Sequence, residues 1–81
     1  MENNKIKVYV KTNGNHEIID VNSEVFIKDY TDWTYIDEGL GDKYALAQTH
    51  YFEKPLFEDD GKPNYKYDNK KVVEVKQWKK F

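Results

Sequence analysis

The chain has 81 residues and a mass of 9.7 kDa, with no cysteine and with 15 acidic against 13 basic side chains. This length predicts a single domain, which buries only about 60–65% of the surface that the unfolded chain exposes. The lack of cysteine excludes disulfide bonds, thiol catalysis and cysteine-ligated zinc. No apolar run approaches the roughly 18 residues of a membrane span, and Met1–Asn4 does not resemble the start of a signal peptide. We therefore expect a small soluble domain made in a reducing compartment, not secreted by a signal peptide.

Aromatic side chains are the main source of core-forming surface. Leu, Ile, Val and Phe supply only 19 of the 81 residues, close to the roughly 20% below which chains tend to be disordered. Aromatic residues nevertheless make up 16% of the chain and the net charge is only −2, whereas disordered chains combine few aromatic residues with high net charge. The composition predicts a folded domain whose core is built from rings and β-branched side chains.

An N-terminal β-hairpin is the clearest local prediction. Apolar and lysine side chains alternate over residues 5–11, which is typical of a half-buried strand. Asn13-Gly14 follows, and Asn-Gly favours a two-residue hairpin turn because both central positions need positive φ. That turn gives the cross-strand pairs Val10–Glu17, Tyr9–Ile18, Val8–Ile19 and Ile6–Val21. The predicted register gathers one apolar patch, formed by Ile6, Val8, Ile19 and Val21.

Short segments of different kinds are predicted for the middle of the chain. Asn22-Ser23 can cap one or two helical turns over residues 24–28, and a turn is expected at residues 30–32. Aromatic and β-branched residues predict a third strand over residues 33–36. The two glycines within residues 37–42 are expected to interrupt regular structure before a single helical turn over residues 44–48.

The signals return to β-structure after Phe52. Extended runs at residues 55–57, 65–67 and 72–75, separated by turns at 59–61 and 68–70, predict a three-stranded meander. The predicted fold class is mainly β, a small α+β domain with an N-terminal β-hairpin, a third strand, a C-terminal β-meander and one or two short helical turns. We expect one β-rich domain over residues 1–75 and a flexible C-terminal tail over residues 76–81.

Charge is unevenly distributed along the chain. Residues 27–60 hold nine acids and three lysines, a net of −6, whereas residues 61–81 hold seven lysines and two acids, a net of +5. These segments can form solvated faces that partly neutralise each other. Alternatively, they can make a head-to-tail or partner contact, which added salt would weaken.

Few residues have the pattern of a catalytic or metal site. His16 lies beside the hairpin turn and His50 follows 34 residues later, which is not a metal-ligand spacing. Ser23, the only serine, lacks the flanking glycines of a nucleophile elbow. The acidic loop 37–42 lacks the alternating oxygen ligands and the terminal Glu of an EF-hand, so calcium binding is a minor alternative there. We predict no enzyme activity, no catalytic residue, no metal site and no cofactor.

The lysine- and aromatic-rich C-terminal end is the candidate interaction surface. Tyr65, Lys66, Tyr67 and Trp78 form a pattern found on strand surfaces that stack bases or sugars, although alternate rings in a small β domain are more often core. All 13 basic residues are lysine. The lack of arginine argues against sequence-specific nucleic-acid recognition, but an AT-rich genome would give the same composition.

Several segments together resemble a known group of proteins. The sharpest motif is Trp-x-x-Ile-Asp-Glu-Gly-x-Gly-Asp-Lys-Tyr from Trp33 to Tyr44, followed by Ala47-Gln48 and Tyr51-Phe52. The resemblance spans roughly residues 5–75 and also includes Ile18–Ser23, Lys54–Leu56, Gly61 and Tyr65–Tyr67. The chain resembles small proteins and C-terminal modules encoded in prophages of Gram-positive bacteria, in the tail-fibre and baseplate region near the lysis genes. Other members carry histidine after Gly-Asp-Lys-Tyr, where this chain has Ala45-Leu46, which further weakens histidine chemistry.

The resemblance implies a virion-associated or host-interaction role and supplies no catalytic residue. The motif residues are Trp33, Ile36, Gly39, Gly41, Asp42, Tyr44, Tyr51 and Phe52. We expect Trp33 and Ile36 to anchor a strand, the two glycines to turn the chain, and the Tyr and Phe rings to close the core.

The predicted function is a non-enzymatic module of a phage tail or baseplate that acts through protein–protein contacts. Its partners would be other tail proteins or a second copy of the chain, in the virion or the host cytoplasm, with no membrane and no expected nucleic acid. The alternative is a small glycan- or nucleic-acid-binding module that uses the lysine- and aromatic-rich C-terminal end.

Overall fold

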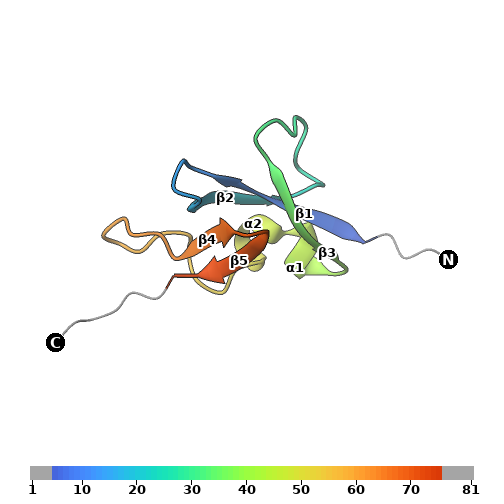
Figure 1. Cartoon of the computed structure of the whole chain (residues 1–81). Helices are drawn as coiled ribbons and strands as arrows, with labels where there is room; N and C mark the ends of the chain where they lie inside the picture. Colours follow the sequence, from blue (N-terminus) through green and yellow to red (C-terminus); the bar gives the residue numbers. More distant parts are fainter. Residues whose placement is uncertain (1–4, 76–81) are drawn as a thin grey trace.

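A three-stranded antiparallel sheet and a two-stranded hairpin make up most of the regular secondary structure (Figure 1). The computed structural model describes residues 5–75, so the predicted tail over residues 76–81, with Trp78, lies outside the described residues. The elements are β1 (Ile6–Thr12), β2 (Ile18–Ser23), β3 (Thr34–Gly39), α1 (Asp42–Ala45), α2 (Ala47–His50), β4 (Tyr65–Asp68) and β5 (Lys71–Glu74). The prediction of a mainly β fold with short helical turns is confirmed.

The main sheet has the order β2-β1-β3, with α1, α2 and the β4–β5 hairpin on one side of it (Figure 1). We call this side the covered face, and it holds the core. The buried apolar cluster consists of Val8, Val10, Ile18, Val21, Ala47 and Tyr65. Partly buried side chains pack around this cluster, namely Ile36, Tyr44, Tyr51, Phe52, Leu56, Tyr67 and Val72.

The β1–β2 hairpin is present, but its predicted register is wrong. Val10 pairs with Val21 instead of Glu17. The turn spans three residues, because the His16 N–H donates to the Asn13 carbonyl at 3.0 Å and the Asn13 N–H donates to the Glu17 carbonyl at 3.1 Å. His16, not Gly14, takes the positive φ, at 66°. This is the three-residue loop with a left-handed residue that follows the two-residue loops in frequency.

Each edge strand of the main sheet contains a β-bulge. In β2 the pairing shifts between Lys11 and Thr12 of β1, which leaves Ile19 as the extra residue. Ile18 and Val21, three positions apart, consequently both face the core, at 0% and 3% exposure, while Ile19 is 42% exposed. In β3 the pairs Val8–Asp37 and Tyr9–Tyr35 leave Ile36 as the extra residue.

The helical turns predicted over residues 24–28 are absent, and that prediction is wrong. The chain forms a turn instead, in which the Ser23 hydroxyl accepts the Val25 N–H at 3.1 Å and the Ser23 carbonyl accepts the Phe26 N–H at 3.0 Å. Glu24 is held by β1, because its N–H donates to the Lys7 carbonyl at 2.8 Å and its carboxylate accepts the Lys7 N–H at 2.9 Å. These bonds extend the β1 ladder past the end of β2.

The third strand is longer than predicted, and the two helical segments are short. β3 begins at Thr34 and continues to Gly39, so the expected interruption at Asp37 is wrong. Asp37 and Glu38 instead pair with Val8 and Lys7 of β1. The predicted helical region becomes two four-residue helices separated by Leu46.

The C-terminal half contains the β4–β5 hairpin and one isolated bridge. Asn69 and Lys70 both have positive φ, 51° and 63°, which is the two-residue turn that suits a twisted hairpin. The run at residues 55–57 contributes only the Phe57–Pro63 bridge, not a third strand of a meander. The Tyr67 N–H donates to the His16 carbonyl at 2.9 Å, which ties this hairpin to the main sheet.

Three main-chain N–H groups of the edge strands are bonded to the side chain of the preceding residue. Asp20 Oδ1 accepts the Val21 N–H at 2.9 Å and Asn22 Oδ1 accepts the Ser23 N–H at 2.9 Å, both in β2. Asp37 Oδ1 accepts the Glu38 N–H at 2.8 Å in β3. Each bond gives an edge donor a local partner within its own strand.

Within residues 5–75, no helix is long and apolar enough to cross a membrane. The acidic and basic segments found in the sequence are linked by the ion pairs Lys54–Glu74 and Lys62–Asp60. Both pairs involve exposed side chains, so they contribute little to stability.

Candidate interaction surface

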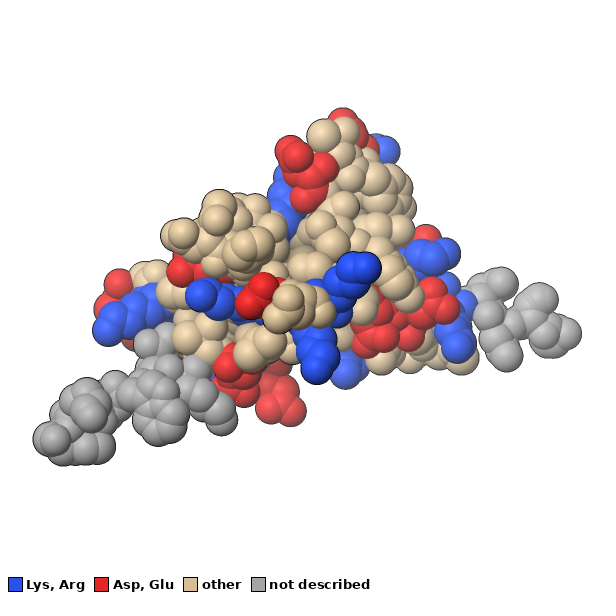
Figure 2. All heavy atoms as spheres, viewed as in Figure 1, with Lys and Arg blue, Asp and Glu red and all other residues tan. Residues whose placement is uncertain are grey.

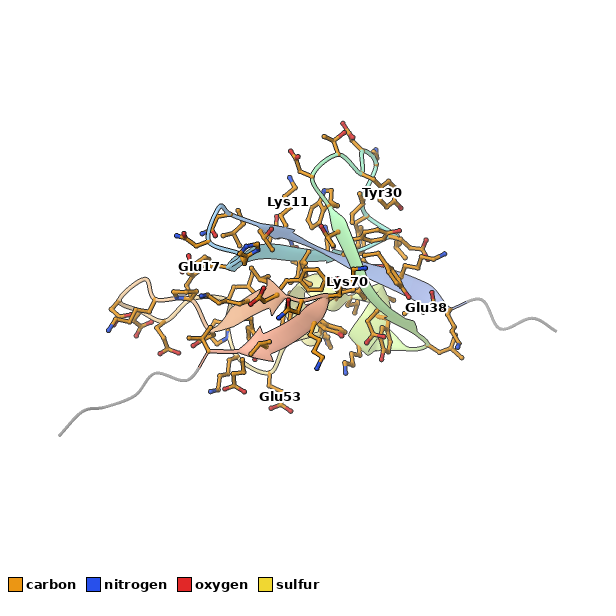
Figure 3. The ribbon with its side chains drawn as sticks, in the orientation of Figure 1. Lys11, Glu17, Tyr30, Glu38, Glu53 and Lys70 are labelled. Atoms are coloured by element: carbon orange, nitrogen blue, oxygen red, sulfur yellow. The ribbon has the colours of Figure 1, made fainter. Side chains whose placement is uncertain are left out.

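The side of the main sheet opposite the core carries a cluster of aromatic side chains. Tyr9 and Lys11 alternate along β1 with the buried Val8 and Val10, so they point away from the core. Tyr35 lies opposite Tyr9 on β3. We call the set Tyr9, Lys11, Tyr30, Trp33 and Tyr35, with Glu38 beside it, the aromatic face. Figure 3 labels Lys11, Tyr30 and Glu38 around β3, and Figure 2 shows uncharged surface over the upper part of β3, with acidic and lysine side chains near its lower end and around the top of the molecule.

Tyr9 holds two other tyrosine rings in edge-to-face contact. Its ring centroid lies 4.9 Å from that of Tyr30 and 6.0 Å from that of Tyr35, with interplanar angles of 68° in both pairs. Such pairs contribute about 0.5–1.5 kcal/mol beyond the area that they bury. Tyr30 and Tyr35 nevertheless remain 43% and 45% exposed. The outer rings are therefore held in place while a large part of each stays accessible.

The Tyr35 hydroxyl is a fixed hydrogen-bond donor on this face. It donates to Glu38 Oε1 at 3.1 Å. Partial desolvation, followed by the bond to Glu38, raises the pKa of Tyr35 above its usual value. The phenol therefore stays protonated at neutral pH, and the Glu38 carboxylate retains capacity to accept further bonds.

Trp33, which was expected to anchor a strand, belongs to the aromatic face and not to the buried core cluster. It is half-buried and comes directly before β3. The Lys11 ammonium lies 4.8 Å from the centroid of the Trp33 ring, a cation–π contact. The main-chain N–H of Trp33 donates to the Tyr30 carbonyl at 3.0 Å, in a turn where Asp32 has a φ of 70°. Asp29 Oδ1 accepts the Thr31 N–H at 2.9 Å, and this bond lowers the pKa of the Asp29 carboxyl.

The glycines of the motif have two different roles. Gly39 is the last residue of β3 and does not turn the chain. Glycine is needed there because a Cβ atom would lie 2.4 Å from Cε2 of Tyr44. The residue gives room to the Tyr44 ring. Gly41, with a φ of 101°, does turn the chain, and its carbonyl accepts the Tyr44 N–H at 3.0 Å. Asp42 follows as the first residue of α1, where a carboxylate suits the helix dipole.

The other rings of the motif lie on the covered side, as expected. Tyr44, Tyr51, Phe52 and Tyr65 form a chain of ring contacts with centroid distances of 6.0, 5.0 and 4.2 Å. The Tyr51 hydroxyl donates to Asp37 Oδ2 at 2.7 Å. Burial and then this bond raise the pKa of Tyr51. Ile36 also packs against the core, so it anchors β3 as expected.

The C-terminal surface predicted from the sequence is only partly available. Tyr65 is 7% exposed and stacks on Phe52, so it belongs to the core and cannot serve as an open platform. Tyr67 packs against the same core, and Lys66 is half-buried and bridges to Glu17. Trp78 lies outside the described residues. The sequence showed the alternation of this strand. It did not show which side of the strand the rest of the chain would cover.

The two histidines belong to different elements. His16 is an exposed turn residue, and the His50 ring Nδ1 lies 2.8 Å from the hydroxyl oxygen of its neighbour Thr49. Among the described residues, no group of three or more His, Asp or Glu side chains could hold a metal ion. In the acidic loop, Asp37 bonds to Tyr51 and Glu38 to Tyr35, so both carboxylates have local partners.

Tyr9, Tyr30 and Tyr35 were not among the residues that the sequence predicted for a site. The alternation of β1 was the signal that could have found Tyr9, because the residue lies between two valines of the core face.

No family model matches the chain, and comparisons with curated proteins and with solved structures found no match.

Proposed function

We propose that this chain is a non-enzymatic interaction module that binds a partner protein through its aromatic face. The observation that carries the proposal is the tyrosine cluster, in which Tyr30 and Tyr35 are held against Tyr9 yet stay more than 40% exposed. The buried core cluster lies on the covered face, so these exposed rings are not part of it.

The composition of the aromatic face suits a protein interface. Tyr and Trp are enriched at the energetic centres of interfaces because they bury a large area with few rotatable bonds. Ring positions that are already fixed lower the entropy cost of binding. Lys11 and Glu38 provide a polar margin beside the rings, with one charge of each sign. The partner would therefore present an apolar patch with both donors and acceptors around it.

The resemblance of the Trp33–Tyr44 motif supports a place in the tail or baseplate of a phage, in the virion or in the host cytoplasm. The partners would then be other tail proteins. The glycan- or nucleic-acid-binding alternative has less support, because Tyr65 of its C-terminal surface is buried.

The test is co-expression of the chain with each protein encoded in the tail and baseplate region of its own prophage, followed by measurement of the affinity of any complex. The double substitution of Tyr30 and Tyr35 by serine should weaken binding at least about tenfold. The control is Val73→Thr, which alters an exposed apolar residue of β5. Binding unchanged by the serine substitutions would contradict the role of the aromatic face, and absence of the chain from purified virions would contradict a place in the particle.

A further inference from the structure

The tip of the β1–β2 hairpin, outside the aromatic face, holds a main-chain nitrogen next to a side-chain amide in the dipeptide Asn13-Gly14. Residues 13–16 are exposed, and Figure 3 labels Glu17 beside this turn. A Cβ atom added at Gly14 would meet nothing within 4 Å, so the nitrogen of this residue is not crowded. In the part of the chain from 5 to 75, the Gly14 N–H donates no hydrogen bond. The Gly14 nitrogen is therefore an accessible nucleophile once it loses its proton.

The Asn13 carboxamide is the electrophile that this nitrogen can reach, because bond formation between the two closes a small succinimide ring. The Gly14 nitrogen loses its proton and bonds to Cγ of Asn13, while Nδ2 takes up a proton and leaves as ammonia. Water then bonds to one of the two ring carbonyl carbons, the bond from that carbon to the nitrogen breaks, and the nitrogen regains a proton. The product is aspartate, or isoaspartate in which the main chain runs through the former side chain. Water is the only co-reactant.

The folded hairpin holds the Asn13 carboxamide at both of its polar atoms. Oδ1 accepts the N–H groups of Asn15 and Glu17, at 2.9 and 3.0 Å, and Nδ2 donates to Glu17 Oε1 at 2.8 Å. The two bonds to Oδ1 favour attack on Cγ, because they would stabilise the negative charge that develops on this oxygen. The bond to the Glu17 side chain opposes the reaction, because it holds the nitrogen that has to leave and places a carboxylate near the developing negative charge. The Glu17 side chain is thus the contact that restrains the reaction.

We infer that Asn13-Gly14 is a site of spontaneous deamidation, which the Glu17 side chain restrains while the chain is folded. A second acidic or amide residue followed by glycine, in Asp60-Gly61, lacks the same features. The N–H of that glycine donates to the Glu58 carbonyl at 2.8 Å, and the side chain before it is a carboxylate, which is a poorer electrophile than a carboxamide. This pair serves as an internal control.

The loop with Asn13 also joins the main sheet to the β4–β5 hairpin. The His16 carbonyl accepts the Tyr67 N–H at 2.9 Å, and Glu17 pairs with Lys66 in an isolated bridge. Isoaspartate at position 13 would add a carbon atom to the main chain of the loop and so displace the His16 carbonyl from Tyr67. Modification should therefore weaken the contact between the two parts of the fold and lower the melting temperature.

The test is incubation of the full chain at neutral pH, both folded and in concentrated urea, followed by proteolysis and by mass spectrometry that detects the exchange of NH2 for OH. The modification should map to the peptide with Asn13, at a rate at least about tenfold lower in the folded chain than in urea, which is the factor that one bond to a charged group supplies. Glu17→Ala should raise the folded-state rate at least about tenfold and leave the rate in urea unchanged. Glu17→Gln keeps an acceptor for Nδ2 without the negative charge, so it should give an intermediate rate.

Gly14→Ala tests the nucleophile. A methyl group there meets no other atom but crowds the nitrogen, so the fold should be kept while the rate falls at least about tenfold in both states. Glu53→Ala is the matched control, because it removes an exposed carboxylate elsewhere, and it should change neither rate. Equal folded-state rates for the parent chain and both Glu17 variants would overturn the role of Glu17. Absence of modification in urea, or isoaspartate at Asp60 formed as fast as at Asn13 in the folded chain, would overturn the site.

Discussion

The two faces of β1 differ in both chemistry and packing, although they are built from alternate residues of one strand. Val8 and Val10 are fully buried beneath the helices and the β4–β5 hairpin. Tyr9, between them, faces the other way and meets Tyr30 and Tyr35. The covered face combines aliphatic side chains with rings that pack against one another within the chain, whereas the opposite face holds rings that stay accessible.

This difference predicts that substitutions on the two faces have unequal effects on stability. Removal of apolar volume from the covered face should lower the free energy of unfolding, because the lost side chain leaves a cavity. Changes on the aromatic face should have smaller effects on stability, because solvent already reaches those rings.

The adjacent Ile18 and Ile19 give the sharpest contrast. Ile18→Ala should lower the free energy of unfolding by about 2–5 kcal/mol, since this side chain is fully buried. Ile19→Ala is the matched control and should cost about 1 kcal/mol or less, because the bulge leaves Ile19 42% exposed. Urea unfolding of both variants measures the difference. Equal losses would show that the bulge does not separate the two side chains in solution.

The bond between Tyr51 and Asp37 makes the covered face sensitive to alkaline pH. Above the ordinary tyrosine pKa of about 10, the unfolded chain loses the Tyr51 proton while the folded chain keeps it. The folded state then binds more protons, so the free energy of unfolding falls as the pH rises. Tyr51→Phe should cost about 1–3 kcal/mol at pH 7, because Asp37 Oδ2 loses its donor, and should make the alkaline fall shallower.

Unfolding of the parent chain and the Tyr51→Phe variant at pH values from about 7 to 11 measures both effects. Tyr67→Phe serves as the control at pH 7, because it also removes a hydroxyl from a ring packed against the core but leaves the bond between Tyr51 and Asp37 intact, so it should cost less. An alkaline slope that is identical in the parent and Tyr51→Phe would count against the bond.

Trp33 measures the opposite face. Trp33→Ala should lower the free energy of unfolding by about 1–2 kcal/mol, through the loss of partial burial and of the contact with Lys11. A fully buried tryptophan would cost about 3–5 kcal/mol. Thermal or urea unfolding distinguishes the two ranges, and Lys11→Met isolates the cation–π part. A loss in the higher range would place Trp33 in the core after all.

Local sequence patterns predicted the elements better than their pairing. The alternation over residues 5–11 identified β1, and turn residues located both hairpins. The turn type was assigned to the wrong hairpin, because the two-residue loop occurs at Asn69-Lys70 and the Asn-Gly loop has three residues. In the first hairpin the Asn13 carboxamide oxygen accepts the N–H groups of Asn15 and Glu17, which favours the longer loop.

Tertiary contacts account for the other departures. A turn replaces the predicted helix at Glu24 because this residue bonds to Lys7, seventeen residues away. No local sequence signal shows that contact. A tertiary contact also removes Tyr65 from the predicted surface, because Phe52 stacks on its ring. Alternation identifies two faces of a strand, but the face that becomes core depends on which elements cover it.

The side-chain bonds to the edge N–H groups of Val21, Ser23 and Glu38 affect whether copies of the chain can pair strand to strand. A small sheet with open edges tends to add strands from neighbouring molecules without limit, and growth of this kind ends in fibrils. Asp20, Asn22 and Asp37 already occupy donors that such growth would recruit. Addition of a strand at either edge would first have to break these bonds, so they disfavour growth along the backbone.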